Sequence, residues 1–371
     1  MTSTGDRVAR AHRESWGRVL ATVARSCGDL ELAEDCTQRA YERALTRWQD
    51  EVPENPVAWL TSVARRLAVD EHRHREVVRR ALPLLVLEKP GGGVDAGDDG
   101  PDLLRLVFCC CHPALDRPGQ VALTLRLVCG VPTDEIARVL LVRRATAAAR
   151  ITRAKAKIVQ AAVPYRIPDA EHLPERRDVV LDVIHLVATA AHERARTDRD
   201  GDLTERAWIL ARSLVESMPD DPEARGLLGL IVLNAARSGA RHGPDGEVLL
   251  GDQDRGRWDP HGVRTGLRLA TEALDGGLAL ADGPGRFALQ AGIAGLHAKA
   301  TSMEETDWPA VVRLYDRLVE RWPTPVVRLN RAVARSYVDG PNVGLAELEP
   351  LVDEPDLREY PYLHAARGAL L

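Results

Sequence analysis

The sequence predicts an all-α protein made of two small helical domains, a flexible linker between them and a longer array of helices after them. Aromatic residues are scarce, with 7 Trp, 6 Tyr and 2 Phe among 371 residues, so the cores depend on aliphatic side chains, which favours helices. Apolar residues recur every three or four positions through most of the chain. One stretch interrupts this pattern, EKPGGGVDAGDDGP at 88–101, whose glycines and acidic residues cannot pack a core and indicate a linker.

Charge is divided unevenly along the chain. The net charge is −5, but residues 1–162 carry 25 Lys and Arg against 21 Asp and Glu, a net of +4, whereas residues 163–371 carry 25 against 34, a net of −9. Because phosphate attracts cations, a nucleic-acid-binding part is expected in the first segment. No apolar signal segment opens the chain and no run approaches 18 apolar residues, so we expect a cytoplasmic protein with no membrane partner.

Six cysteines all precede residue 130, and no two form a C-x-x-C pair. Cys109, Cys110 and Cys111 are consecutive. Consecutive residues on a helix point about 100° apart, so these three cannot converge on one metal ion. We therefore expect reduced and mostly buried cysteines, with no metal and no cofactor.

Three helices are predicted at the front, at 6–27, at 29–48 and from Pro56 onward, with Asn55 as the N-cap of the third. The second helix turns five polar side chains outward: Glu31, Asp35, Gln38, Arg39 and Glu42. The third helix carries one aromatic ring near its start and then basic residues: Trp59, Arg65, Arg66, Arg73, His74 and Arg75. Cations that follow phosphates and a ring that stacks on bases suit melted DNA, although Trp59 is equally compatible with a core position.

A helix-turn-helix is predicted at 132–158. Thr133 is expected to cap a short first helix, and a second helix begins near Arg144. Small and aliphatic residues form one buried stripe on the second helix, namely Ala147, Ile151, Ala154 and Ile158. The other faces carry the expected contacts to a DNA major groove: Arg143, Arg144, Thr146, Arg150, Arg153, Lys155 and Lys157.

These segments together resemble an extracytoplasmic-function (group 4) sigma factor of the sigma-70 superfamily over residues 1–162. DLELAEDCTQRAYERAL resembles the helix that docks on the clamp of the largest RNA polymerase subunit, and NPVAWLTSVARRLAVDEHRHR resembles the helix that melts and reads the −10 promoter element. QVALTLRLVCGVPTDEIARVLLVRRATAAARITRAKAKI resembles the helix-turn-helix that reads the −35 element.

The resemblance implies two partners, core RNA polymerase and promoter DNA. Polymerase would be bound through its clamp and through the flap of the second-largest subunit. The five outward residues of 29–48 would contact the polymerase, the six residues of the third helix the −10 element, and the seven residues of the helix-turn-helix the −35 element. Three alanines follow Thr146 on the recognition helix, so the promoter sequence stays open.

The rest of the chain reads as helices joined by short turns, at 175–195, 203–217, 222–237, 262–275, 286–299, 308–321, 325–338 and 342–351. LVESMP at 214–219 and LVERWP at 318–323 each close one helix and precede another. Their offset of 104 residues is close to three units of about 34, the tetratricopeptide period, so a helical repeat is expected.

The segment GDQDRGRWD at 251–259 stands out in a polar loop. From composition it is a loop whose Asp and Arg residues pair locally and whose Trp258 fills a groove. It also resembles the Asp-Gln-Asp-Arg-x-Arg-Trp hallmark of the sigma-factor subgroup with a C-terminal tetratricopeptide-like extension. The residues of this motif are Asp252, Gln253, Asp254, Arg255, Arg257, Trp258 and Asp259.

Four segments are therefore predicted: a sigma region 2 domain at 1–82, a flexible linker at 83–101, a sigma region 4 helix-turn-helix domain at 102–162 and a tetratricopeptide-like helical domain at 163–371. The hypothesis is a sigma factor regulated in cis by its C-terminal domain, either through restraint of the sigma domains or through added polymerase contacts. The alternatives are a stand-alone helix-turn-helix regulator whose repeats bind a ligand or protein, and an interaction scaffold. No catalytic motif occurs in the sequence, so an enzyme is not expected.

Overall fold

The computed structural model describes residues 3–49, 51–81, 99–168, 171–192, 201–243, 246–355, 357–358 and 360–371. Within these ranges every element is helical except a short hairpin, in which β1 (His242–Gly243) pairs antiparallel with β2 (Gly246–Glu247). The predicted all-α class is confirmed. The chain divides into two compact units, Met1–Ser217 and Met218–Leu371. Most of the predicted linker at 83–101 lies outside the described residues, and its end begins a helix.

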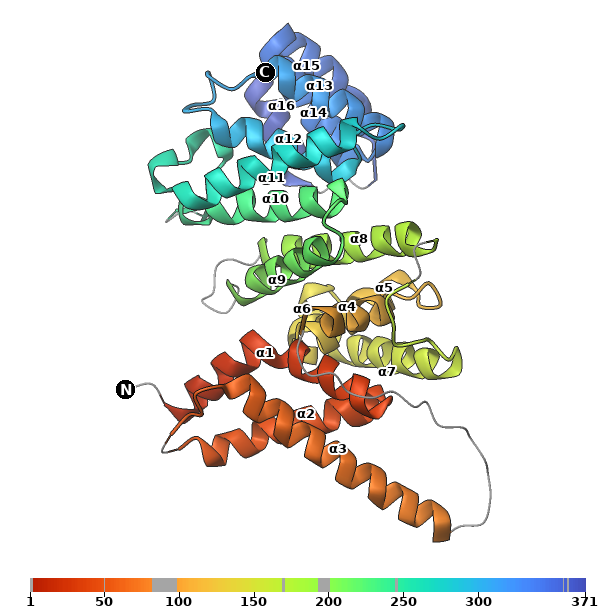
Figure 1. Ribbon diagram of the computed structural model, residues 1–371. Coiled ribbons are helices and arrows are strands. Elements are labelled where there is room, and N and C mark those ends of the chain that lie inside the picture. The colour runs from red at the N-terminus through yellow and green to blue at the C-terminus, as the bar shows by residue number, and fades with distance from the viewer. Residues whose placement is uncertain are drawn as a thin grey trace. The chain divides into compact units, whose positions relative to one another are not determined.

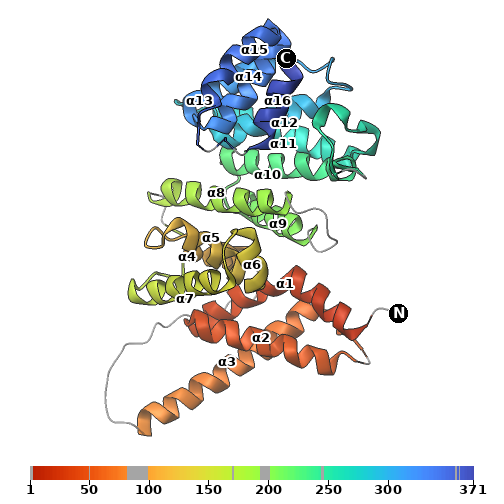
Figure 2. The same cartoon turned by 180° about the vertical axis from the view of Figure 1, so that it is seen from behind.

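The first three helices pack on one another and are called the N-terminal bundle: α1 (Thr4–Cys27), α2 (Leu30–Arg47) and α3 (Pro56–Ala81). Local signals set their ends. Ser3 and Asp6 form a capping box, and Gly28 ends α1 at a φ of 67°, where glycine lacks the strain of other residues. Asp29 caps α2, and Asn55 accepts a hydrogen bond of 3.0 Å from the Ala58 amide at the start of α3. The second half of α3 extends beyond α1 and α2 (Figures 1 and 2).

The next elements are called the helix-turn-helix domain: α4 (Asp99–Cys110), α5 (Arg117–Leu123), the π-helical turn η1 (Thr124–Val128), α6 (Thr133–Val139) and α7 (Arg144–Gln160). The predicted stripe of Ala147, Ile151, Ala154 and Ile158 is buried. The predicted cap at Thr133 is wrong by one residue, because Pro132 holds the N-cap position and no side chain caps α6. Leu141 makes the turn between α6 and α7 at a φ of 50° and is 93% exposed.

Two further helices, α8 (Leu173–His192) and α9 (Gly201–Ser217), belong to the same compact unit. They pack on each other, and both contact α4 while α8 also contacts α5. The chain segment expected to begin a separate C-terminal domain at residue 163 therefore starts by covering the helix-turn-helix domain. The four predicted segments remain a proposal about which parts fold independently.

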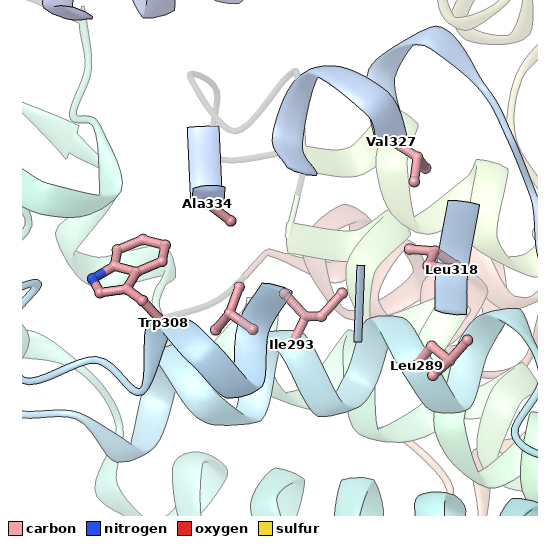
Figure 3. Packing of buried hydrophobic residues seen from close by; sticks show 7 residues of the cluster. Leu289, Ile293, Trp308, Leu318, Val327 and Ala334 are labelled. Atoms are coloured by element: carbon pink, nitrogen blue, oxygen red, sulfur yellow. The ribbon is translucent and has the colours of Figure 1, made fainter. Parts of the chain in front are cut away.

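The second unit is a succession of helices: α10 (Pro222–Ala236), α11 (Pro260–Leu278), α12 (Arg286–Lys299), α13 (Trp308–Arg321), α14 (Pro325–Asp339), α15 (Pro341–Leu348) and α16 (Pro361–Leu370). Short 3-10 turns η2 (Ser238–Ala240), η3 (Leu250–Asp252), η4 (Arg255–Arg257) and η5 (Glu349–Leu351) join them. Each helix packs on the next, as the sequence predicted for this region. Apolar side chains of α12, α13 and α14 form one core cluster (Figure 3): Leu289, Ile293, Trp308, Val311, Leu318, Val327 and Ala334.

Close approach of α10 and α12 organises the start of this unit. Both carboxylate oxygens of Glu223 in α10 accept hydrogen bonds from amides of the first turn of α12, at 2.9 and 3.0 Å from Phe287 and Ala288. This contact satisfies amides that have no partner within the helix. A Cβ atom on Gly226 would lie 2.5 Å from the Ala288 nitrogen, so glycine is needed where the two backbones meet.

We expect Gly226→Ala to lower the free energy of unfolding by about 1–3 kcal/mol, because the added methyl group must push α12 away from α10. Gly368→Ala in α16 is the matched control, since a Cβ atom there meets nothing within 4 Å and replaces glycine inside a helix. That variant should be unchanged or slightly more stable. Urea unfolding followed by circular dichroism measures both, and equal midpoints for the two variants would contradict the packing.

Candidate nucleic-acid and polymerase interface

Helix α7 presents cations to solvent along one side of the helix-turn-helix domain. Five of the seven residues predicted to contact DNA are exposed: Arg143, Arg144, Thr146, Arg153 and Lys157. Arg144 pairs with Asp134 of α6 at 2.5 Å, and with side chains 76% and 62% exposed this pair is weak and easily exchanged. The face is therefore available to a phosphate backbone.

Two of the seven predicted residues are placed differently. Arg150 is half-buried and lines an apolar pocket. The pocket is also lined by Val139 at the end of α6, by the next residue Leu140, and by Leu186 and Val187 of α8. Lys155 is also half-buried, and its ammonium group bonds to a carboxylate of the N-terminal bundle. The structure thus separates these two cations from the exposed set.

Helix α3 presents the residues predicted to contact melted DNA. Arg66 and Arg73 are exposed, and Arg65 is half-buried. Trp59 is half-buried and its ring meets that of Trp48 in an edge arrangement, with ring centroids 5.5 Å apart, so it is packed on Trp48 and still partly accessible. The side chains of His74 and Arg75 lie outside the described residues.

The outer face of α2 is polar and open along its length. All five residues predicted to contact polymerase are exposed: Glu31, Asp35, Gln38, Arg39 and Glu42. Gln38 donates a hydrogen bond of 3.1 Å to Glu42, one turn on. The opposite face of α2 is packed, with Ala33, Cys36 and Ala40 fully buried.

One charged residue lies on that packed face, and the sequence reasoning did not identify it. Glu34 is 5% exposed. It accepts a hydrogen bond of 2.9 Å from Arg126 Nε of η1 and bonds to Lys155 Nζ of α7. A signal existed, because a glutamate between buried alanine and cysteine positions of an amphipathic helix needs a buried partner. The sequence did not indicate where that partner comes from.

An aromatic cluster links α1 to α2 and η1. Trp16 donates a hydrogen bond of 3.1 Å from Nε1 to the Leu127 carbonyl. Its ring lies 4.8 Å from His12 and 5.8 Å from Tyr41, measured between centroids. Burial, with a smaller effect of the Arg206 charge from α9, lowers the pKa of His12 to about 4. His12 is therefore neutral at pH 7.

The motif at 251–259 acts as a structural connector in the second unit. Arg255 Nη1 donates to the His297 and Ala300 carbonyls at the end of α12, both at 2.6 Å. Trp258 is buried and lies under the guanidinium groups of Arg237 and Arg255, at 5.4 and 4.9 Å from its ring centroid. Gln253 is buried, and Asp254 and Asp259 cap η4 and α11. The side chains of Asp252 and Arg257 are exposed.

Helix α8 is tied to the helix-turn-helix domain by polar contacts. Arg117 of α5 pairs with Asp182 and donates to the Val179 carbonyl at 3.4 Å. Arg176 of α8 donates to the Phe108 carbonyl at 2.6 Å, and its guanidinium lies 5.9 Å from the Phe108 ring centroid. These contacts all involve the first half of α8, which is thereby tied to α4 and α5.

Two family models match the N-terminal bundle and the helix-turn-helix domain. The model of sigma-70 region 2 matches residues 13–77, and the model of sigma-70 region 4 matches residues 110–158. The chain belongs to the sigma-70 family. It is an extracytoplasmic-function-like sigma factor with a C-terminal extension, and a family of unknown function, DUF6596, matches residues 176–274. As a sigma factor it binds core RNA polymerase and promoter DNA in transcription initiation.

One relative matches nearly the whole chain. An uncharacterized protein of Rhizobium meliloti (strain 1021) is 38% identical over 367 residues, which cover 95% of this sigma factor and 85% of the relative. No solved structure matches the chain. No helix in the described part of this sigma factor is long and apolar enough to cross a membrane. Its cysteines are free, and all but the half-buried Cys27 are buried.

The buried position of His12 predicts a dependence of stability on pH. Because its pKa is about 4 when folded and about 6.5 when unfolded, the unfolded chain binds the proton more readily between these values. The free energy of unfolding should therefore fall as the pH is lowered from 6.5 to 4. In His12→Gln this pH slope should be shallower whatever the stability at pH 7. Urea unfolding at pH 7 and at pH 5 gives the loss of unfolding free energy between these two values. An equal loss in the wild type and in His12→Gln would contradict the burial of a neutral imidazole.

Proposed function

We propose that this sigma factor reads the −35 element through the exposed cations of α7 and the −10 element through α3, while the outer face of α2 docks on the polymerase clamp. The observation that carries the proposal is the exposure of these three surfaces on the segments that match sigma-70 regions 2 and 4. Each surface has the chemistry its partner requires. Arginine and lysine side chains neutralise phosphates, and a half-buried tryptophan offers an aromatic ring for base stacking.

We further propose that the C-terminal extension regulates initiation in cis. Its first helix, α8, packs on α4 and α5 and shares an apolar pocket with Arg150 of the recognition helix. The pairing of Arg117 with Asp182 brings a carboxylate of the extension to the helix-turn-helix domain. The family resemblance also implies a contact with the flap of the second-largest polymerase subunit. We propose that the helix-turn-helix domain makes this contact, and the extension packs on that domain through α8.

We expect Arg153→Ala to reduce promoter-specific run-off transcripts about tenfold and to lower the salt dependence of promoter binding by about one phosphate contact. The matched control is Arg264→Ala on α11, an exposed arginine outside the proposed DNA surfaces. Transcription with core polymerase at two salt concentrations measures both effects. An equal loss of transcripts in Arg153→Ala and Arg264→Ala would contradict a role of α7 in DNA binding.

Charge reversal on α2 tests the proposed polymerase surface and distinguishes a sigma factor from a stand-alone regulator. Arg39→Glu should abolish binding to core polymerase, because it inverts charge at the centre of the outer face, and should leave binding to isolated promoter duplex unchanged. Arg264→Glu is again the control. A stand-alone DNA-binding regulator would keep its full activity in both variants, and that outcome would contradict the docking role of α2.

A further inference from the structure

The N-terminal bundle and the helix-turn-helix domain are joined by two buried carboxylates, one from each side. Glu34 of α2 binds Arg126 of η1 and Lys155 of α7. Asp102 of α4, which is 2% exposed, pairs with Arg25 of α1 at 2.9 Å. Buried carboxylates are costly unless they are paired. Asp102 also pairs with Arg105 of its own helix, whereas Arg126 and Lys155, which pair with Glu34, both belong to the other domain, so the burial of Glu34 requires that domain to stay in place.

Shape complementarity supports the ion pairs. A Cβ atom on Gly17 of α1 would lie well inside contact distance of the Val128 carbonyl oxygen, so the two backbones approach as closely as glycine permits. Trp16 donates to the Leu127 carbonyl beside it. Tyr165, which follows α7, donates to the Ala21 carbonyl of α1 at 3.0 Å. The contact is therefore built along α1 as well as at Glu34.

The C-terminal extension contributes to the same junction. Helix α9 packs on α4, and Arg206 of α9 is 7% exposed. Its charge acts on His12 of α1 and Tyr41 of α2. The first two helices of the extension thus contact the helix-turn-helix domain, and α9 also reaches the N-terminal bundle.

This closed arrangement cannot read both promoter elements. Twenty-five base pairs separate the −10 and −35 positions, about 85 Å of B-form DNA at 3.4 Å per base pair. In the structure Lys155 of the recognition helix bonds to Glu34 of α2, so the two DNA-reading parts are in direct contact. The Glu34 carboxylate also pairs with the Lys155 ammonium group, which is therefore not available to bind a phosphate of the −35 element.

We propose that Glu34 is an intramolecular latch, which holds the helix-turn-helix domain on the N-terminal bundle by occupying Arg126 and the DNA-contacting Lys155, and which opens when the protein engages polymerase and promoter. The proposal rests on the proposed function and extends it, because Lys155 is one of the seven residues predicted from the sequence to contact the −35 element and would become available to DNA only when the latch opens. The outer face of α2 remains open in the closed state. Polymerase docking therefore precedes reading of the −35 element, and DNA phosphate replaces the carboxylate on Lys155.

The first test measures the latch in the full chain without polymerase or DNA. Fluorophores placed at Arg10 of α1 and Gln160 of α7, two exposed positions, report the distance between the two parts. Glu34→Gln keeps the side-chain volume and removes the charge. Arg126→Gln removes one cation that is not a predicted DNA contact. Both should raise the open population about tenfold or more, as a lost charge-assisted hydrogen bond does. Glu14→Gln on the exposed side of α1 should change nothing.

The second test measures transcription from a promoter that the wild-type protein uses. Both latch variants should initiate faster than the wild type at limiting polymerase, and Glu14→Gln should not. Unchanged energy transfer in Glu34→Gln and Arg126→Gln would overturn the latch, even if the wild type transcribes normally. Opening in these variants without transcripts from any protein, the wild type included, would instead contradict the sigma function while leaving the latch intact.

Discussion

The carboxylate of Glu34 is the constraint on which the arrangement of the first unit depends. While the Glu34 carboxylate is buried, at 5% exposure, it must keep its partners, because removal of one side of a buried ion pair is strongly destabilising. Its partners come from η1 and α7, some 92 and 121 positions further along the chain. The position of the recognition helix is thereby tied to α2. Gly17 and Trp16 shape the neighbouring surface of α1 so that η1 fits against it.

Helix α2 consequently serves two surfaces. Its outer face is polar and exposed and lies in the segment that matches sigma-70 region 2, and its inner face carries Glu34, which binds Arg126 and Lys155 of the helix-turn-helix domain. Ala33 and Ala40 keep the inner face close-packed, and both are fully buried. If polymerase binds the outer face as proposed, docking on one side of α2 can release the helix-turn-helix domain from the other side.

The sequence predicted the elements well because their signals are local. Asn55, Asp29 and Gly28 mark helix ends, and Pro325 opens α14 at the residue where the pattern placed it. Periodicity also identified the buried stripe of α7. It identifies which face of a helix is buried and not what covers it. The partners of Glu34, the packing of α8 and α9 on α4 and α5 and the half-buried state of Lys155 are all long-range contacts, so they emerged only from the structure.

The motif at 251–259 also shows that a local pattern predicts local structure and not long-range contacts. Its composition suggested a local capped loop with a buried tryptophan, and Asp254, Asp259 and Trp258 hold those positions. Arg255 instead reaches the end of α12, 42 and 45 residues away, which no local pattern indicates. The motif organises the extension, and the contacts of the extension with the sigma domains begin earlier in the chain, at α8 and α9.

The central claim is promoter-specific initiation by this chain, and transcription with core polymerase on a promoter library tests it most directly. We predict transcripts from a distinct subset of sequences that share two short elements about 25 base pairs apart, none of them transcribed by core polymerase alone. A product pattern identical to that of core polymerase alone, together with no binding of the protein to the polymerase, would contradict the account.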